Sequence, residues 1–231
     1  MSDILQRFPH AREVFGELSE TELSLFPHRT LRAGEYLTKR DEDNQGKFFY
    51  VLSGVLVGED QKGLTDGGLP VQFVRGDFIG FSEQLYTPAL PSTFSTRCKT
   101  SVQVLEIARE QMDMLVRVHP RLPFGIFRSV LNKAQNARSV LVKCTSSKTN
   151  IAVAYYLAHL YDTYLTLQPE GFSGPIRIID THKELCSTLG CSKRTVDRYI
   201  AEFAEIGMIM LKRGKIHIDA EQRKKLESYI G

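Results

Sequence analysis

The stretch from Thr181 to Ile209 constrains the fold of this chain most, because two amphipathic patterns meet there at a glycine. Apolar residues recur at helical spacing on both sides of Gly190, which is typical of helices with one buried face. Gly190 permits the backbone angles of a tight turn, and Ser192 is placed to cap the second helix. We therefore predict two short helices that meet at a fixed angle, a helix-turn-helix. The apolar positions are Leu185, Cys186 and Leu189 before the turn and Val196, Tyr199, Ile200 and Phe203 after it.

The solvent-facing side of the second predicted helix begins with basic residues. Long cationic side chains there can reach base edges in a major groove, while hydroxyl groups suit phosphate oxygens. Residues 209–219 alternate around a glycine and predict a β-hairpin with a basic tip. That order is typical of a winged helix-turn-helix and favours binding to double-stranded DNA over a structural helical hairpin. The candidate DNA-binding residues are Thr181, Lys183, Ser192, Lys193, Arg194, Thr195, Arg198, Lys212, Arg213 and Lys215.

Length and composition fit this interpretation. At 231 residues the chain is longer than a typical single domain, so we expect two domains. The net charge of +3 is small, and affinity for nucleic acid must therefore come from local clusters of cations. No apolar run approaches the roughly 20 residues that span a bilayer, and the first residues lack a signal-peptide pattern. Because the four cysteines also form no CxxC pair or disulfide framework, we expect a cytoplasmic protein without a membrane segment.

The first half of the chain has a different pattern, in which short alternating apolar segments are separated by glycines. This pattern is typical of an antiparallel sheet. Residues 59–70 are polar and glycine-rich, as expected of a hairpin tip. We predict a compact β-roll of about a hundred residues, which makes the fold α+β. The predicted strands fall within residues 48–57, 71–74, 78–81 and 102–107.

A helical pattern follows from Arg109 to Cys144, with a break at His119–Pro120. Its second part carries apolar residues at alternating intervals of three and four, the seam of a coiled coil. The seam either joins two copies of the chain or packs on its own domain. A homodimer suits a helix-turn-helix protein, because two recognition helices then reach half-sites one DNA turn apart. The predicted interface residues are Phe127, Val130, Ala134, Ala137 and Leu141, followed by Cys144.

These patterns divide the chain into three parts. Residues 1–108 form the roll, which we expect to sense an effector. Residues 109–145 form the dimerisation helix and linker. Residues 146–231 form the winged helix-turn-helix domain.

The order of these parts and three local motifs resemble the CRP/FNR family of transcription regulators, over nearly the whole chain. The motifs are Phe49–Gly54, Gly76–Gly80 and Gly190–Arg198, which read FYVLSG, GDFIG and GCSKRTVDR. The resemblance implies a homodimer that binds an inverted repeat and acts on RNA polymerase. It also places Lys193, Arg194 and Arg198 at base-reading positions. Cyclic-AMP-type members carry an acidic residue where Arg194 stands, so we expect a different half-site.

The resemblance is weaker where those members bind their nucleotide. The glutamate that follows their GDFIG-like run is replaced by Phe81, and an Arg-Ser pair by Ser92 and Thr93. A buried phosphodiester without its arginine lacks a charge-assisted partner, and we therefore disfavour cyclic AMP. Arg75 or Arg97 could supply the charge, although solvated strand residues are the commoner case. The roll binds either an unidentified small molecule or nothing. The candidate effector-pocket residues are Phe81, Ser82, Glu83, Ser92, Thr93 and Arg138.

Other cofactors fit less well. No cysteine precedes Cys98, so the N-terminal ligands of an iron-sulfur cluster are absent. His10, His28 and His119 are the candidate haem ligands, but a lone histidine is usually an ordinary surface or packed residue. Cys98 and Cys144 are either redox-responsive thiols or buried inert ones.

Two rival functions remain to be weighed. A metalloenzyme with a β-barrel needs histidine ligands on its strands, and none occurs between residues 29 and 118. No phosphate loop or hydrolase motif occurs either, so we do not expect an enzyme or a metal site. The other rival is a nucleotide-binding or interaction module whose C-terminal helices bind protein. A steep salt dependence of binding would favour DNA over protein.

Overall fold

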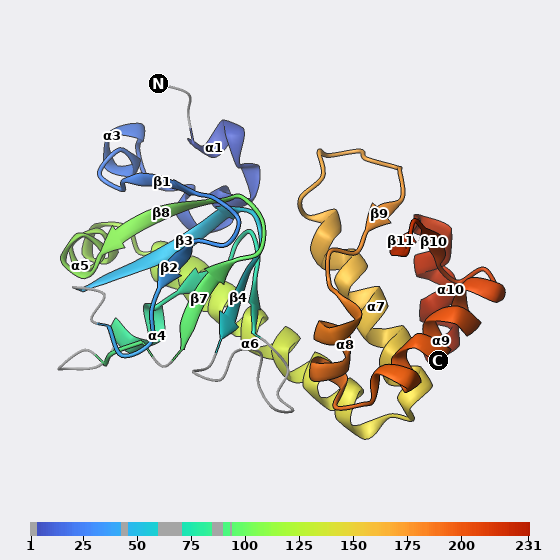
Figure 1. Cartoon of the computed structure of the whole chain (residues 1–231). Helices are drawn as coiled ribbons and strands as arrows, with labels where there is room; N and C mark the ends of the chain where they lie inside the picture. The colour runs from blue at the N-terminus through green and yellow to red at the C-terminus, as the bar shows by residue number, and fades with distance from the viewer. Residues whose placement is uncertain (1–3, 43–45, 60–70, 85–89, 93) are drawn as a thin grey trace. The chain divides into compact units, whose positions relative to one another are not determined.

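The structure is a computed structural model of the whole chain and describes residues 4–42, 46–59, 71–84, 90–92 and 94–231. Contacts divide it into a roll unit, which ends at Gln135, and a winged unit, which begins at Asn136. The division lies within the long helix α6 (Leu122–Ser146), inside the segment predicted to be the dimerisation helix (Figure 1).

The described residues of the roll unit form two four-stranded antiparallel sheets. One has the strand order β1-β8-β3-β6, and the other has the order β2-β7-β4-β5. Tyr50 of β3 lies opposite Leu105 of β8, and Leu56 of β4 lies opposite Cys98 of β7. The strands are β1 (His28–Leu31), β2 (Tyr36–Thr38), β3 (Lys47–Ser53), β4 (Leu56–Glu59), β5 (Gln72–Phe73), β6 (Phe78–Ile79), β7 (Ser95–Cys98) and β8 (Val102–Ala108).

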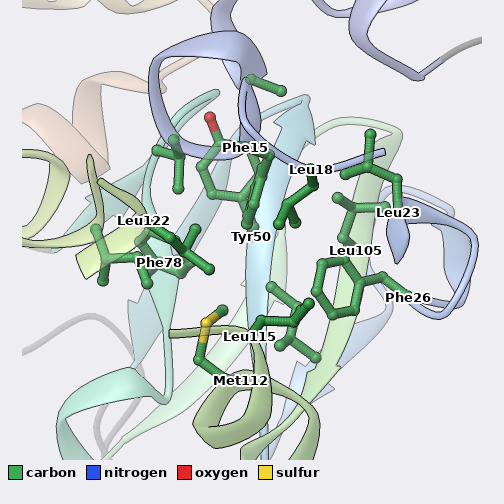
Figure 2. Packing of buried hydrophobic residues seen from close by; sticks show 14 of the residues in the cluster. Phe15, Leu18, Leu23, Phe26, Tyr50, Phe78, Leu105, Met112, Leu115 and Leu122 are labelled. Atoms are coloured by element: carbon green, nitrogen blue, oxygen red, sulfur yellow. The ribbon is translucent and has the colours of Figure 1, made fainter. Parts of the chain in front are cut away.

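Strand β3 is buried on both faces because its side chains alternate between two cores. Phe49 and Val51 join the core that also holds Leu56 of the second sheet. Tyr50 points to the other side, into a core shared with helices (Figure 2). There the Tyr50 ring meets the Phe15 ring edge to face, with 4.9 Å between ring centroids. A continuous apolar run in the sequence therefore becomes the centre of the roll.

Short N-terminal helices and the helices after the roll supply the rest of this second core. Phe15, Leu115 and Leu122 represent three of the contributing helices, and each side chain is almost fully buried. These elements are α1 (Ile4–Arg7), the 3-10 helix η1 (Pro9–Ala11), α2 (Arg12–Phe15), α3 (Glu20–Leu23), α4 (Phe81–Gln84), α5 (Arg109–Val118) and α6.

Gly54 closes the turn between β3 and β4. Its φ is +97°, and a Cβ placed there would lie 2.4 Å from the main-chain oxygen of Ser101. Only glycine fits both the backbone angle and the close approach.

The winged unit is built around α7 (Thr149–Leu165). This helix packs against α10 and also contacts β9, α8 and α9. The three strands described in the unit form a small antiparallel sheet in the order β10-β11-β9. The other elements are β9 (Ile176–Arg177), α8 (His182–Leu189), α9 (Lys193–Glu205), β10 (Met210–Lys212), β11 (Lys215–Ile218) and α10 (Ala220–Ile230).

The predicted α+β class is confirmed, as are the two helices of the helix-turn-helix, the hairpin after them and the break at His119–Pro120. The predicted strands overlap β3, β4, β5, β6 and β8, and Gly34–Glu35, where the family resemblance expects a strand to open, directly precede β2. Strands β1 and β7 were missed. Most of the expected hairpin tip, residues 60–70, lies outside the described residues. No helix in the described part of the chain is both long and apolar enough to cross a membrane.

Candidate nucleic-acid interface and roll interior

The helix-turn-helix is defined by caps at both helix starts. The Thr181 hydroxyl accepts a hydrogen bond from the Glu184 main-chain N–H at 3.2 Å, and the Glu184 carboxylate accepts one from the Thr181 N–H. Gly190 ends α8 with a left-handed φ of 60°. Two residues later, the Ser192 hydroxyl accepts from the Thr195 N–H and starts α9. The local sequence therefore fixes both ends of the turn.

Packing and a side-chain hydrogen bond hold the two helices together. Leu185 of α8 and Val196, Ile200 and Phe203 of α9 are buried, as the apolar pattern predicted. Tyr199 is only half-buried, and so are Cys186 and Leu189. The His182 imidazole on α8 lies 2.6 Å from the Asp197 carboxylate on α9, which ties the start of one helix to the middle of the other.

The start of α9 presents unpaired cations to solvent. Lys193, Arg194 and Arg198 are exposed, and no carboxylate within the described residues forms an ion pair with them. Arg194 and Arg198 are four residues apart and therefore share one side of the helix. The Arg198 guanidinium lies over the Tyr199 ring, 4.6 Å from its centroid, so an aromatic surface supports its position.

The wing brings three more cations to one tight turn. Lys212 lies opposite Lys215 across the hairpin, and Arg213 and Gly214 form the two-residue loop between them. Both loop residues have positive φ, 50° at Arg213 and 71° at Gly214, as a type I′ turn requires. Lys212, Arg213 and Lys215 are all exposed, and so is the predicted contact residue Lys183 on α8.

Three of the predicted contact residues also have structural roles. The hydroxyls of Thr181 and Ser192 are engaged in the helix caps, and the Thr195 hydroxyl lies 2.9 Å from that of Ser192. Thr195 is half-buried. These side chains position the cationic ones, and any contact with phosphate would come in addition to that role.

The structure gives the described effector-pocket candidates different local surroundings. Phe81 packs its ring against Phe48 and Phe78, at 5.2 and 5.6 Å between centroids, and so contributes to the roll core. The side chain is only half-buried, and its assignment to an effector pocket stays a prediction. Ser82 is exposed and donates a hydrogen bond to the buried Glu83 carboxylate at 2.7 Å. Ser92 is buried, Thr93 lies outside the described residues, and Arg138 is exposed on the part of α6 in the winged unit.

The two arginines that could replace a phosphate-binding arginine have other surroundings. The Arg97 guanidinium donates to the Glu59 carboxylate at 2.6 Å, and Glu59 also accepts from the Tyr36 hydroxyl. Arg75 is exposed, and its charge helps to lower the pKa of His10. Arg97 is thus already paired within its own sheet.

Sequence reasoning missed the contact between α6 and the turn that joins β5 to β6. The Lys133 ammonium lies 2.7 Å from the Asp77 carboxylate and donates to the main-chain oxygen of Gln72. It also lies 5.0 Å from the centre of the Phe73 ring. The Ser129 hydroxyl donates to the Gly76 carbonyl at 2.6 Å. A signal was available, because Lys133 follows Ile126 and Val130 on the core-facing side of α6.

Two amides are buried without hydrogen-bond partners. Gln72 and Gln84 are 8% and 3% exposed, and both polar atoms of each side chain lack a partner among the residues that the structure describes. Buried amides are normally satisfied by protein or water, so both positions have unused donor and acceptor capacity.

The predicted seam on α6 is divided between two environments. Phe127, Ala134, Ala137 and Leu141 are exposed, and the Phe127 side chain is 62% exposed. Val130 is half-buried and packs against the roll core, and its assignment to the interface stays a prediction. Phe124 and Leu131 are exposed and were not predicted.

The thiols of Cys98 and Cys144 are buried, and burial raises their pKa to about 11 and about 12. Both thiols are therefore protonated at neutral pH, which fits the prediction of inert buried cysteines better than a redox role.

No protein-family model matches the chain, and no curated protein matches it. Several solved structures match the chain. A transcriptional regulator of the CRP/FNR family from Thermus thermophilus superposes with a TM-score of 0.67 at 21% identity, over 89% of this chain and all of the regulator. A CooA mutant from Carboxydothermus hydrogenoformans superposes with a TM-score of 0.66 at 15% identity, over 95% of this chain and 94% of the other.

A third structure adds a relative whose effector is named. The c-di-GMP-responsive global regulator CLP of Xanthomonas campestris superposes with a TM-score of 0.65 at 18% identity, over 86% of this chain and 96% of the regulator. At these identities the similarity establishes the fold, and the chemistry of each site rests on this chain's own residues.

Proposed function

We propose that this chain, which has the fold of the CRP/FNR-family transcriptional regulators, is a homodimeric DNA-binding regulator of transcription. The observation that carries the proposal is a set of exposed cations on α9 and the wing that form no ion pair with a carboxylate of the described residues. Cations that lack carboxylate partners are free to replace the counterions of a polyanion, and that exchange drives binding to DNA.

The two cationic elements have different roles in this proposal. Lys193, Arg194 and Arg198 stand at the start of α9, the part of a recognition helix that contacts base edges. An arginine there can donate two hydrogen bonds to guanine. Lys212 and Lys215 flank a narrow hairpin turn and suit the phosphate backbone, which positions a protein without reading sequence.

The exposed apolar face of α6 supports a homodimer. Six exposed residues of α6 follow the alternating three- and four-residue spacing of a coiled coil. They are Phe124, Phe127, Leu131, Ala134, Arg138 and Leu141. Two copies joined along this face would be related by a twofold axis. Their recognition helices would then address an inverted repeat with half-sites one helical turn apart, about 34 Å.

Regulation in this proposal runs from the roll through α6. Lys133 and Ser129 attach α6 to the β5–β6 turn, so a ligand that changes this turn changes the equilibrium between two positions of the helix. Cyclic AMP remains disfavoured, because Arg97, one of the two arginines that could supply the missing charge, is paired with Glu59. RNA polymerase is the partner expected of such a regulator, and the cytoplasm is its expected location.

Selection from a pool of randomised duplex DNA tests the proposal. We expect enrichment of an inverted repeat and a steep fall in affinity between two salt concentrations. The matched control is the Arg194→Ala/Arg198→Ala variant, which should lose sequence preference while remaining folded. Sequence-blind binding with a shallow salt dependence would contradict the proposal and favour a protein-binding role for the C-terminal helices.

A further inference from the structure

Two cysteines occupy the paired positions at the end of α8. Gly190 is in the left-handed conformation, and its N–H donates to the Cys186 carbonyl. The Cys191 N–H donates to the same carbonyl at 3.2 Å. This is a Schellman-type helix end, in which the side chains at the two positions that Cys186 and Cys191 occupy commonly touch. The backbone therefore places the two cysteines at positions from which their side chains can meet.

These thiols differ from the other two in the chain. Cys186 and Cys191 are free and half-buried, whereas Cys98 and Cys144 are buried. Burial and the charge of Cys186 raise the pKa of the Cys191 thiol, which agrees with the short separation that the helix end imposes. Small oxidants can reach the first pair and not the second.

We propose that Cys186 and Cys191 form a reversible intramolecular disulfide when the protein meets a small-molecule disulfide, and that this bond weakens DNA binding. The first thiolate attacks a sulfur of the oxidant and releases one small thiolate. The second cysteine thiolate then attacks the mixed disulfide and releases the other. Two electrons pass to the oxidant, and the two protons from the cysteines go to the two small thiols.

The bond acts on DNA binding because Cys191 directly precedes the start of α9. Ser192 is the next residue, and its hydroxyl caps α9 through the Thr195 N–H. Lys193 and Arg194 come directly after the cap. A disulfide fixes the two sulfurs at about 2.05 Å, much closer than two thiols in contact, and draws Cys191 towards α8. The cap and the first cations of α9 must move with it. This second part of the proposal rests on the proposed function.

The surroundings of the thiols set the pH dependence of the reaction. Burial raises the pKa of Cys186, the Asp197 carboxylate raises it further, and the Lys193 ammonium lowers it. Asp197 also lies 2.6 Å from the His182 imidazole, which shares the exposed side of α8 with Cys186. Because only thiolates attack disulfides, the rate of disulfide formation should rise steadily from pH 7 to about pH 9.

Glutathione disulfide tests the site in the full-length protein. After oxidation, the free thiols are blocked and the peptides are mapped by mass spectrometry. We expect one cross-link between Cys186 and Cys191, reversed by dithiothreitol and absent from the Cys191→Ser variant. The Cys98→Ser variant, altered at a buried thiol, is the matched control and should form the cross-link like the parent protein.

Affinity for the selected duplex is measured on the same samples. Oxidation should weaken binding at least about fivefold, the effect of losing one base contact, while Cys191→Ser should be insensitive to the oxidant. Mixed disulfides in place of a cross-link would overturn the site, and a cross-link with unchanged affinity would overturn its regulatory effect. If the reduced protein binds no duplex, the proposed function fails, and the peptide map alone still decides the disulfide.

Discussion

The roll unit and the winged unit use their charged residues in opposite ways. In the roll, Glu106 is held by Lys47 at 2.7 Å and by Arg29 at 3.1 Å, and Glu59 is held by Arg97. In the winged unit, the cations at the start of α9 and at the wing tip have no carboxylate partner within the described residues. The sheets of the roll thus hold Arg29, Lys47 and Arg97 against carboxylates, whereas α9 and the wing present cations that pair with no carboxylate among the described residues.

The same contrast appears within the winged unit. Arg223 forms three hydrogen bonds to the Asp162 carboxylate, which tie α10 to α7 away from the recognition helix. In this unit an arginine that connects two helices of the scaffold is therefore paired with a carboxylate. Unpaired cations at Arg194, Arg198 and Arg213 are the distinguishing property of the proposed DNA surface. Changes there should reduce binding, and changes to paired charges should reduce stability.

The largest effect is expected where two copies of the chain meet. Phe127→Asp/Leu131→Asp places two charges on the exposed face of α6, and sedimentation should then find a monomer. Affinity for the inverted repeat should fall by about a hundredfold or more, because one half-site no longer assists the other. Met114→Asp, on an equally exposed apolar side chain of α5, is the control. A dimer that survives the double substitution would refute this interface.

Arg198→Ala should weaken binding to the selected site by about 1 to 3 kcal/mol, because a base-contacting arginine is lost. Its free energy of unfolding should change by less than about 0.5 kcal/mol, since the side chain is exposed and has no ion-pair partner. Fluorescence anisotropy and chemical denaturation measure the two quantities. A loss of stability without a loss of affinity would assign Arg198 a structural role instead of a contact with DNA.

Lys133→Met should reduce the stability of the protein rather than its affinity for DNA. The Asp77 carboxylate then still accepts a hydrogen bond from the Val74 N–H at 2.8 Å, but it loses the Lys133 ammonium as its ion-pair partner. The free energy of unfolding should therefore fall by about 1 to 2 kcal/mol. This is less than the cost at fully buried pairs, because the Lys133 side chain is 24% exposed. Lys133→Met/Asp77→Asn should recover part of the loss in denaturant titrations. Equal stabilities of the single variant and the parent would show that the pair contributes nothing.

The smallest effect concerns His10, whose ring stacks on Tyr50 at 6.2 Å. Burial, and then the charge of Arg75, lower the pKa of His10. The folded protein therefore binds fewer protons than the unfolded chain below about pH 6.5, and stability should decrease as the pH falls through that range. His10→Phe should flatten this dependence by less than about 1 kcal/mol, and Arg75→Gln should flatten it in part. An unchanged slope of stability against pH in His10→Phe would assign the dependence to other groups.

Local signals made the winged unit predictable. The caps at Thr181 and Ser192 and the turn at Gly190 act over a few residues, so the sequence pattern alone placed α8 and α9. Helix α10 has the same kind of signal, because Asp219 and Gln222 form a reciprocal cap, but its polar surface concealed it. No signal of that strength marks β1, where one of four side chains is buried.

Contacts between distant residues were harder to predict. Lys133 pairs with Asp77 across 56 residues, and neither position indicates the other. Phe81 was assigned to a ligand pocket from its place after the Gly76–Gly80 motif, and its contacts with Phe48 and Phe78 could not be read from that motif. Family resemblance thus located the segment and did not fix the direction of its side chain.

Lysine acetylation with and without the selected duplex, read by mass spectrometry, tests the central contrast most directly. The account predicts that DNA protects Lys193, Lys212 and Lys215 strongly. Lys39, paired with Glu42 in the roll, and Lys224, paired with Glu221 on α10, should be modified equally in both samples. Protection of the paired lysines, with Lys193 and the wing fully reactive, would contradict the claim that the unpaired cations are the DNA-binding surface.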